Sequence, residues 1–331
     1  MSSFRRKLDR VLYYATNVGR DIAPQFLFRS RLSTILASHK QFDSEYLASR
    51  VNYYNKLPRR AAAAAAEKFG ATSASISLSR SFYYFDLKEH TRYFPRSLRM
   101  NYLFGDVIHV PDLPSLVKSR PIDCENANSV LMKLEKFRHF HFPQDEIAFH
   151  EKQPMAVWRG YLNNPKRADL VRRYHQHPLC DIGHTARSAM PDQRKPFMSS
   201  ADQMKFKYIL SVEGNDVATN LKWVMASNSL CFMTTPVYET WFMEGRLEAG
   251  KHYVCLRPDF ADLDDRILYF EKHQDEALDI IQNANSYVRQ FLDERREQLL
   301  SLLVLYKYFL ATGQIGPSDR LVELTARLFP L

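Results

Sequence analysis

The sequence predicts an α/β protein with two domains. Its 331 residues, 45% of them hydrophobic and 13% aromatic, are enough to form two hydrophobic cores. Residues 207–256 combine short apolar runs with a helical pattern, and a second pattern of this kind begins at residue 156. We therefore expect two α/β domains, with the boundary between them near residues 143–154.

A strand–loop–helix–strand pattern lies at the centre of the argument. Apolar runs at residues 208–212 and 230–233 predict two strands, and a loop containing Gly214 leads from the first strand into a helix. Glycine permits a close backbone approach or a positive φ, and the start of a helix offers free N–H groups to an anion. Lys222, one turn into the helix, adds a positive charge. The pattern fits a phosphate-binding site, and it also fits ordinary α/β architecture.

The first 66 residues predict helices. Residues 1–40 mix apolar residues with many arginines, which is typical of helices that lie on an anionic bilayer and also of packing helices with a solvated basic face. Residues 41–60 predict a helix that ends at Pro58, and the six alanines at 61–66 predict another. No N-terminal apolar run is long enough for a secretory signal or a membrane span, so we expect a cytoplasmic protein.

Two strands and a turn with a carboxylate are expected next. The aromatic run around Tyr83 predicts a strand, and residues 107–110 predict a second strand that a proline-bounded turn ends. Asp112 lies in this turn, and Lys118 and Arg120 follow it. A carboxylate at a strand end near two cations suits a general base beside an anionic ligand. It also suits a turn-forming aspartate followed by a surface pair of cations.

A helix and a second α/β unit follow. Residues 128–141 predict a helix with two histidines near its end, but no carboxylate or cysteine stands at metal-ligand spacing from them. Residues 156–158 predict a strand, and Asn164 followed by proline predicts the start of a helix. Lys166 and Arg167 then fall in the first turn of that helix, where cations oppose the dipole unless an anion binds there.

The C-terminal part predicts more helices. Residues 259–270 and 274–291 have amphipathic spacing. Residues 293–310 are apolar on most sides but too short, and too closely flanked by charge, to span a bilayer, so we expect a helix buried between the domains. A last helix is expected over residues 318–328.

Charge and cysteine content limit the possible partners. A net charge of +9 and a pI near 9.3 indicate an anionic partner, such as nucleic acid, an acidic membrane or a phosphorylated substrate. The sequence lacks a recognition helix with clustered arginines, an aromatic RNA-binding strand and a zinc module, so a non-catalytic nucleic-acid-binding protein is the less favoured alternative. Four widely spaced cysteines indicate neither a disulfide framework nor a zinc site.

A series of short motifs carries a family resemblance. Residues 157–170 read VWRGYLNNPKRADL, and the motifs EG, LKW, SNSL, YETW and HYV follow in order as far as residue 254. In this order the motifs resemble glycosyltransferase family 90, which includes bacterial lipopolysaccharide core glycosyltransferases and animal protein O-glucosyltransferases. The resemblance covers roughly residues 104–291.

The resemblance implies a fold and an activity. The expected architecture is GT-B, with two Rossmann-like domains facing a cleft: an acceptor-side domain over 1–150, a nucleotide-sugar domain over 151–292 and helices over 293–331 that cross back. The expected reaction is inverting transfer of a hexose from a UDP-sugar to a lipopolysaccharide core, without a cofactor or a metal, by a cytoplasmic enzyme peripheral on the inner membrane. A protein or another glycan is the alternative acceptor, and a degenerate fold acting as an adaptor is a further alternative. Nucleic acid is not an expected partner.

The resemblance also implies site residues. Asp112 matches the spacing of the family's catalytic base, and Asp106 is the alternative. The residues expected to contact the nucleotide-sugar are Arg159, Gly160, Arg167, Gly214, Lys222, Glu239 and Lys118. This chain has asparagine and leucine at positions 220 and 221, where the animal enzymes carry an arginine, so we expect Lys222 to replace one phosphate contact or the contact to be missing.

Overall fold

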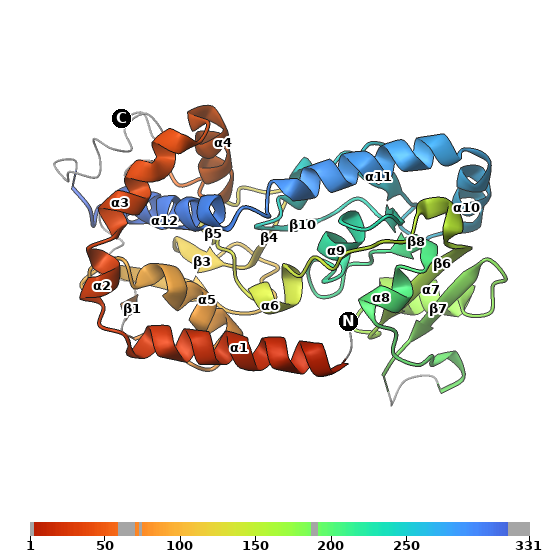
Figure 1. The fold of residues 1–331 in the computed structure, drawn as a ribbon, viewed down its shortest axis with the longest axis horizontal. Helices are drawn as coiled ribbons and strands as arrows, with labels where there is room; N and C mark the ends of the chain where they lie inside the picture. The colour runs from red at the N-terminus through yellow and green to blue at the C-terminus, as the bar shows by residue number, and fades with distance from the viewer. Residues whose placement is uncertain (1–2, 59–69, 73–74, 187–190, 317–331) are drawn as a thin grey trace. The chain divides into compact units, whose positions relative to one another are not determined.

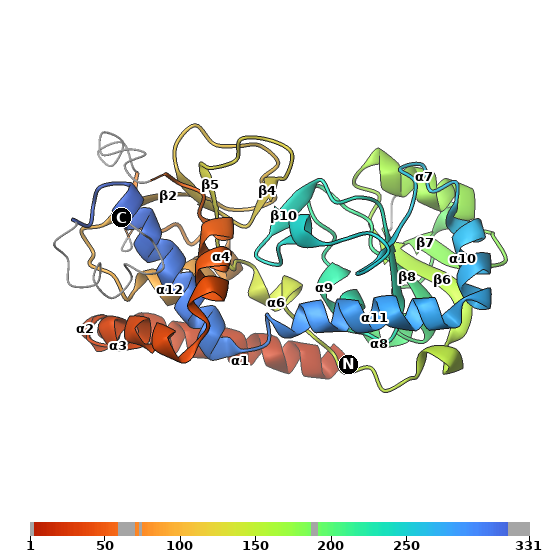
Figure 2. The same cartoon turned by 90° about the horizontal axis from the view of Figure 1, so that it is seen from above.

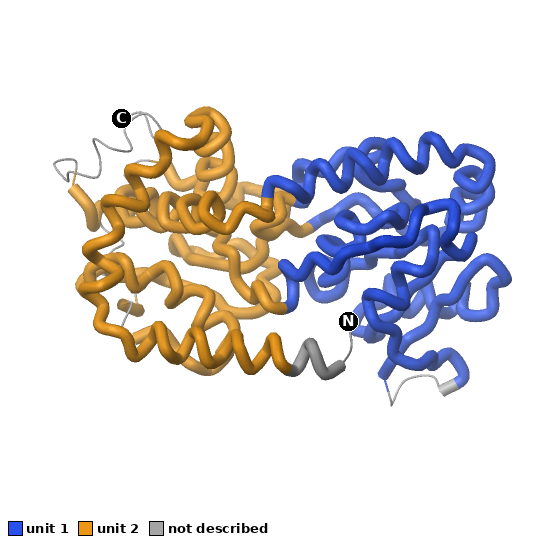
Figure 3. Tube along the Cα trace, in the orientation of Figure 1, with its two compact units in different colours: residues 1–6, 138–237, 244–290 blue, residues 7–137, 238–243, 291–331 orange. Residues whose placement is uncertain are grey.

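The chain forms two compact units. The computed structural model describes residues 3–58, 70–72, 75–186 and 191–316 (Figure 1). Unit 1 comprises residues 1–6, 138–237 and 244–290, and unit 2 comprises residues 7–137, 238–243 and 291–331 (Figure 3). The helices expected at residues 61–66 and 318–328 lie outside the described residues. The α/β class expected from the sequence is confirmed, because each unit combines helices with a sheet that contains parallel strands.

Unit 1 contains a five-stranded parallel sheet in the order β7-β6-β8-β9-β11. The strands are β6 (Gln153–Gly160), β7 (Cys180–His184), β8 (Phe206–Leu210), β9 (Leu230–Met233) and β11 (Val254–Cys255). The helices that pack against them are α7 (Pro165–Tyr174), α8 (Ser200–Gln203), α9 (Leu221–Met225), α10 (Leu263–Lys272) and α11 (Gln274–Arg289). Counted along the chain, the strand order is 2-1-3-4-5, which is a doubly wound arrangement.

The apolar strand sequences explain why this sheet is buried. Every residue of β8 and β9 is buried, because a parallel sheet with helices packed against it leaves no strand face for water. The core of unit 1 therefore joins these strands to the apolar faces of α7, α10 and α11. The strand–loop–helix–strand prediction for residues 208–233 is confirmed, and so is the helix that starts after Asn164.

Unit 2 contains a smaller mixed sheet in the order β1-β2-β3-β5. Its strands are β1 (Ala71–Thr72), β2 (Arg99–Leu103), β3 (Ser115–Val117) and β5 (Ser129–Leu131), and β2, β3 and β5 are parallel. A separate antiparallel pair joins β4 (Ser119–Pro121) to β10 (Tyr238–Thr240). The helices are α1 (Ser3–Ile22), α2 (Phe26–Arg29), α3 (Leu32–Ala37), α4 (Ser44–Tyr54), α5 (Ser81–Thr91) and α12 (Glu294–Ala311), and α6 (Lys136–His139) lies where the chain passes from unit 2 to unit 1.

The long C-terminal helix α12 forms the centre of unit 2. It packs against α3, α4 and α5, and Figure 2 shows α12 beside α4. Glu297 on α12 is buried, accepts hydrogen bonds from Arg50 at 2.7 Å and from the Trp241 indole at 2.6 Å, and is satisfied by these donors. The helix expected over residues 293–310 is thus present as α12, and it belongs to unit 2.

Three sequence-based predictions in unit 2 are wrong. The aromatic run around Tyr83 forms helix α5, because rings of this run pack against α1 and the helix lies against α12, and these contacts outweigh a weak β-propensity. Residues 107–110 form a loop instead of a strand. Residues 128–141 form β5, a connecting segment and the short α6 instead of one helix. The spacing of apolar residues in this segment also fits a helix, but the hydrogen bonds of residues 129–131 to β3 stabilise a strand.

Candidate active site

The carboxyl ends of β6 and β8 meet at the point where the strand order of unit 1 reverses. The loop of residues 161–164 leads from β6 into α7, and the loop of residues 211–220 leads from β8 into α9. In open α/β sheets, ligands bind outside the carboxyl ends of the strands at this point. The two loops therefore define the candidate ligand site of unit 1.

Arg167 connects the two loops. Its guanidinium donates to the carbonyls of Val212 (2.7 Å) and Glu213 (3.1 Å) after β8, and to Tyr161 O (3.3 Å) and Asn163 Oδ1 (2.9 Å) after β6. Four of its five N–H groups are thus used, and one on Nη2 is left for a ligand as far as the described residues extend.

The charge of Arg167 is incompletely balanced. Burial and, to a smaller extent, the nearby cation Arg138 lower the pKa of its guanidinium to about 10, although Asp216 partly offsets both effects. The guanidinium remains protonated at neutral pH. A bound anion would be stabilised by this arrangement, because it would face a positive charge that is partly shielded from water.

Asn164 and Gly214 fix the geometry of the site. Asn164 caps α7 by accepting a hydrogen bond from Arg167 N at 3.0 Å, and its amide donates to the carbonyls of Glu213 (2.9 Å) and Gly214 (2.7 Å). A Cβ on Gly214 would lie 3.1 Å from Arg167 Nη2 and 3.1 Å from Asn163 Nδ2. The structure thus brings the predicted residues Arg167 and Gly214 together, and the glycine serves a close approach, since its φ is not positive.

Gly160 makes room for an aromatic support. A Cβ at this position would lie 2.5 Å from the Trp158 ring, which is rigid and buried. The Arg167 guanidinium lies over the same ring, 5.6 Å from its centroid. Gly160 therefore acts on the site indirectly, by allowing Trp158 to pack beneath Arg167.

Several polar groups near the end of β8 were not identified from the sequence. Glu213 and Asp216 are buried, and Glu213 Oε1 accepts a hydrogen bond from Val237 N at 3.0 Å. The Ser211 hydroxyl is buried and has no partner among the described residues. Arg138 donates to Thr219 Oγ1 at 3.1 Å. Their position after a buried parallel strand is the signal that could have identified the residues of this loop.

Arg159 and Lys222 have other partners within unit 1. Arg159 makes a two-point contact with the Asp181 carboxylate, at 2.8 Å to each oxygen, and its remaining N–H groups donate to backbone carbonyls, so it clamps β6 to β7. Burial would raise the pKa of Asp181, but the hydrogen bonds from Lys195 and Arg159 lower it. Lys222 is buried and donates to Glu244 Oε1 at 2.7 Å.

Glu239 lies in unit 2, whereas Arg167 and Gly214 lie in unit 1. It stands opposite Arg120 in the β10–β4 pair, 2.7 Å from Arg120 Nε, and also accepts a hydrogen bond from the Tyr53 hydroxyl. Arg120 donates in addition to the carbonyl oxygens of Tyr53 and Ser129. Both charged side chains are buried, so they form a hydrogen-bonded ion pair in the interior of unit 2.

Asp106 and Lys118 lie at the carboxyl edge of the parallel strands of unit 2. Asp106 follows β2 and Lys118 follows β3, and Lys118 Nζ donates to Asp106 Oδ1 at 2.6 Å. Glu135, which follows β5, lies 3.9 Å from the same ammonium group. The Asp106 side chain is 32% exposed and that of Lys118 is 2% exposed, so the aspartate is the member of this cluster that solvent or a substrate can reach.

Asp112 lies at the opposite edge of the same sheet. It precedes β3, and its backbone carbonyl accepts a hydrogen bond at 2.9 Å from the side-chain amide of Asn128, which precedes β5. Its exposed carboxylate makes no hydrogen bond or ion pair within the described part of the chain. The structure thus separates the two candidate bases, with Asp106 at the carboxyl edge and Asp112 at the amino edge.

Among the residues that the structure describes, no three histidine, cysteine, aspartate or glutamate side chains are grouped so as to hold a metal ion.

Comparisons with known proteins give one family and several relatives. A model of glycosyl transferase family 90 matches residues 130–313. The chain is 43% identical over 314 residues to O-glucosyltransferase LpsA of Dichelobacter nodosus, and the aligned residues cover 92% of this chain and 96% of that protein. It is 28% identical over 164 residues to protein O-glucosyltransferase 3 of Homo sapiens, covering 47% of this chain and 32% of that protein. It is 23% identical over 192 residues to protein O-glucosyltransferase 1 of Rattus norvegicus, covering 54% of this chain and 48% of that protein.

Proposed function

Because the chain belongs to glycosyl transferase family 90, as its motifs suggested, we propose that it transfers glucose from a UDP-sugar to a lipopolysaccharide core acceptor. The observation that carries this proposal is the similarity to an enzyme named O-glucosyltransferase LpsA over nearly the full length of both proteins. The similarity to protein O-glucosyltransferases covers about half of this chain or less, so we favour a glycan acceptor over a protein.

The donor site of this proposal lies in unit 1. Support comes from Arg167 in the first turn of α7 and Gly214 in the loop after β8, which lie together at the switch point of a doubly wound sheet. Arg167 offers a partly buried positive charge and one N–H that no described residue uses, which suits the diphosphate of a nucleotide-sugar. We assign Gly160, through Trp158, to positioning this guanidinium. Arg159, Lys222 and Glu239 would act on the donor only through the elements that they hold in place.

The catalytic base of this proposal lies in unit 2, and Asp106 is our first choice. Active-site groups of parallel sheets stand at the carboxyl edge, where Asp106 lies with Lys118. Asp112, the choice from sequence spacing, is the alternative, and its support is a carboxylate without a hydrogen-bond or ion-pair partner among the described residues. Lys118 would hold Asp106 in orientation, since the ammonium group is buried and bonded to one carboxylate oxygen.

The proposed reaction is an inverting single displacement in a GT-B architecture. The base accepts the proton of the acceptor hydroxyl as that oxygen bonds to the anomeric carbon and the bond from this carbon to the diphosphate breaks. The positive charge of Arg167 stabilises the leaving diphosphate, and the reaction needs no metal in this scheme. The products are the glycosylated acceptor and UDP.

A peripheral position on the cytoplasmic face of the inner membrane completes the proposal. Apolar residues of α1 that are between 44% and 79% exposed recur at helical spacing: Leu8, Val11, Leu12, Val18 and Ile22. The packed side of α1 carries Tyr13 and Tyr14, which hydrogen-bond to α5. No described helix is long and apolar enough to cross a bilayer. An apolar stripe on a basic protein suits reversible binding to an anionic surface.

The test is a transfer assay. The protein is incubated with UDP-glucose, UDP-galactose or UDP-N-acetylglucosamine, with and without lipopolysaccharide truncated in its core, and UDP release is followed. We expect UDP release from UDP-glucose that depends on the truncated lipopolysaccharide. Release that is equal without this acceptor, or that occurs only with a protein acceptor, would contradict the proposal.

A further inference from the structure

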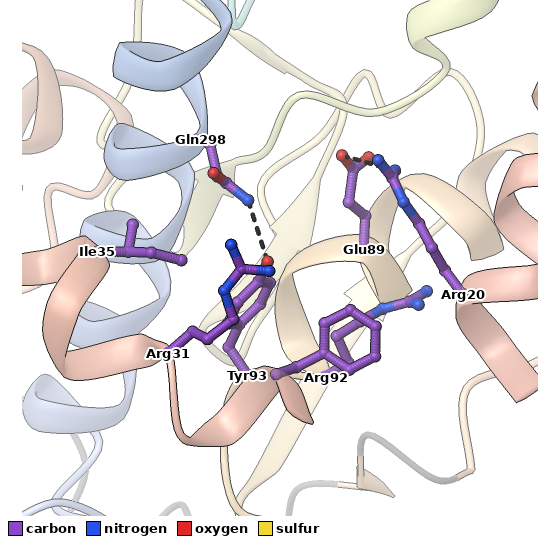
Figure 4. A pocket seen from close by; sticks show the side chains of 8 residues that line it. Arg20, Arg31, Ile35, Glu89, Arg92, Tyr93 and Gln298 are labelled. Atoms are coloured by element: carbon purple, nitrogen blue, oxygen red, sulfur yellow. Dashed lines mark hydrogen bonds and ion pairs between the residues drawn. The ribbon is translucent and has the colours of Figure 1, made fainter. Parts of the chain in front are cut away.

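Unit 2 contains a basic pocket that lies apart from the sheet-edge carboxylates described above. The pocket has a volume of about 250 Å³, and α1, α5, α12 and the α2–α3 region line it. Figure 4 shows Arg31 extending toward Tyr93 and Gln298 on one side of the pocket, and Arg20 reaching Glu89 on the other. Phe28 forms part of the wall. A pocket with three arginines, Arg20, Arg31 and Arg92, would attract an anion.

Arg92 in this pocket has a buried guanidinium whose hydrogen-bonding groups are mostly unsatisfied among the described residues. It is 4% exposed, and only its Nε is used internally, in a hydrogen bond of 2.9 Å to Lys88 O. Neither Nη1 nor Nη2 has a partner among the described residues, and the guanidinium stacks over Phe28 with its carbon 5.0 Å from the ring centroid. Buried polar groups in proteins are nearly always satisfied, and an unsatisfied charged group costs more than a neutral one.

The carboxylates near Arg92 do not supply that partner. Glu89 is bonded to Lys136 and to Arg20, and Asp21 accepts a hydrogen bond of 2.6 Å from the Tyr84 hydroxyl. Burial lowers the pKa of Arg92, and the attraction of Asp21 and Glu89 offsets only part of this effect. The interior of unit 2 therefore leaves the Arg92 charge partly uncompensated.

A second pocket extends the basic region. Its volume is about 220 Å³, it shares Arg20, Phe28 and Arg92 with the first pocket, and Lys88 and Arg96 join its lining. The two pockets together present five cations and two carboxylates, Asp21 and Glu89. An anion with more than one negative charge and several acceptor oxygens would match this set better than a single carboxylate, because each guanidinium donates in a planar fork.

We propose that this pocket binds a phosphate monoester, with Arg92 and Arg31 donating hydrogen bonds to its oxygens and Arg20 adding charge. The phosphate belongs either to a lipid headgroup or to a soluble phosphorylated molecule. This site lies in unit 2, whereas the proposed donor site lies in unit 1, so UDP binding and phosphate binding are separate properties. The proposal does not depend on the proposed transferase reaction.

The experiment uses the full-length protein and three variants that each remove one positive charge. Arg92→Gln removes the buried guanidinium, Arg31→Gln removes an exposed one from the pocket wall, and Arg29→Gln removes a matched exposed charge from α2 outside the pocket. Calorimetry measures binding of sn-glycerol 3-phosphate and, as a control for the donor site, of UDP. Sedimentation with phosphatidylcholine vesicles that contain phosphatidic acid or phosphatidylglycerol at equal fractions tests a lipid source.

We expect Arg92→Gln and Arg31→Gln to weaken binding of a phosphate monoester at least tenfold, while Arg29→Gln changes it less than twofold and UDP affinity is unchanged throughout. A soluble source predicts this loss for glycerol 3-phosphate, and a lipid source predicts it for phosphatidic acid vesicles but not for phosphatidylglycerol vesicles. Equal binding by the original protein and both pocket variants in every arm overturns the proposal, and so does an equal loss in Arg29→Gln. If circular dichroism shows that Arg92→Gln is unfolded, the exposed Arg31→Gln decides.

Discussion

Replacing Asp106 by asparagine tests which carboxylate activates the acceptor. The change removes the ability to accept a proton but preserves the shape of the side chain and an oxygen that can accept the bond from Lys118. If Asp106 is the general base, we expect kcat to fall by about 10²- to 10⁴-fold, because a positioned base contributes about that factor. At about 1.4 kcal/mol for each factor of ten, this is roughly 3 to 5.5 kcal/mol of transition-state stabilisation.

The structure indicates that such a loss would not come from unfolding. The Asp106 side chain is about one-third exposed. After the substitution the Lys118 ammonium group should still have the Glu135 carboxylate, now 3.9 Å away, as an opposite charge. A partly exposed ion pair contributes about 1 kcal/mol or less, so we expect a small change in Tm. UDP-glucose affinity should also stay within about twofold, because Asp106 belongs to unit 2 and Arg167 belongs to unit 1.

The assay compares Asp106→Asn with Asp112→Asn, which makes the same isosteric change six residues later. UDP release at saturating UDP-glucose and acceptor gives kcat, calorimetry gives UDP affinity, and thermal unfolding gives Tm. We expect Asp112→Asn to retain kcat within about threefold. A hundredfold loss in Asp112→Asn with near-normal activity in Asp106→Asn would refute the argument from sheet edges and restore the assignment from sequence spacing. Full activity in both variants would assign the proton acceptor to another residue.

Three further outcomes follow from the same structure. Arg167→Ala should weaken UDP binding by about 1.5 to 3 kcal/mol in calorimetry, and unchanged UDP affinity would remove Arg167 from the site. Arg159→Ala should lower the urea midpoint of unfolding and should reduce UDP affinity less than Arg167→Ala does. Burial lowers the pKa of His90 to about 4, so on acidification this histidine is protonated in the unfolded chain before it is protonated in the folded protein. A contribution to the free energy of unfolding of roughly 3 kcal/mol, complete above about pH 6.5, should therefore be lost as the pH falls to 4. The difference in unfolding free energy between the original protein and His90→Gln should show this loss, and a difference that does not depend on pH would contradict it. Val11→Asp with Ile22→Asp should reduce sedimentation with anionic vesicles, and equal binding by the double variant, or equal binding to neutral vesicles at high salt, would argue against the membrane proposal.

Local patterns were sufficient to predict the main elements of unit 1. The strands at 208–210 and 230–233 are continuous apolar runs, which is what a strand covered on both faces requires, and a glycine loop and a helical pattern stand between them. Asn164 followed by proline marked the start of α7, because capping and the fixed φ of proline act within one turn. The sequence assigned Arg167 and Gly214 to the same expected nucleotide-sugar site, and the contact between them became visible only in the structure.

Unit 2 shows where such patterns stop being sufficient. The residues around Tyr83 have aromatic side chains that suit a strand, yet they form α5 because rings of this run contact α1 and the helix packs against α12, both far away in the sequence. Residues 129–131 have a spacing that also fits a helix, and pairing with β3 decides that they form a strand. In both segments the competing conformations are close in local energy, so long-range contacts decide between them.

The roles of the charged residues depended on tertiary structure in the same way. The sequence identified Arg159, Lys222 and Glu239 as candidates, but their partners Asp181, Glu244 and Arg120 are 22, 22 and 119 residues away along the chain. A charged side chain can be assigned to a ligand only when its internal partners are known, because burial favours whichever opposite charge the fold brings within hydrogen-bonding distance. The sequence by itself determined the family, the α/β class and the types of residue available for the chemistry. The tertiary structure decided which charges are already neutralised inside the protein, and which, such as those of Arg167 and Arg92, are incompletely balanced within it.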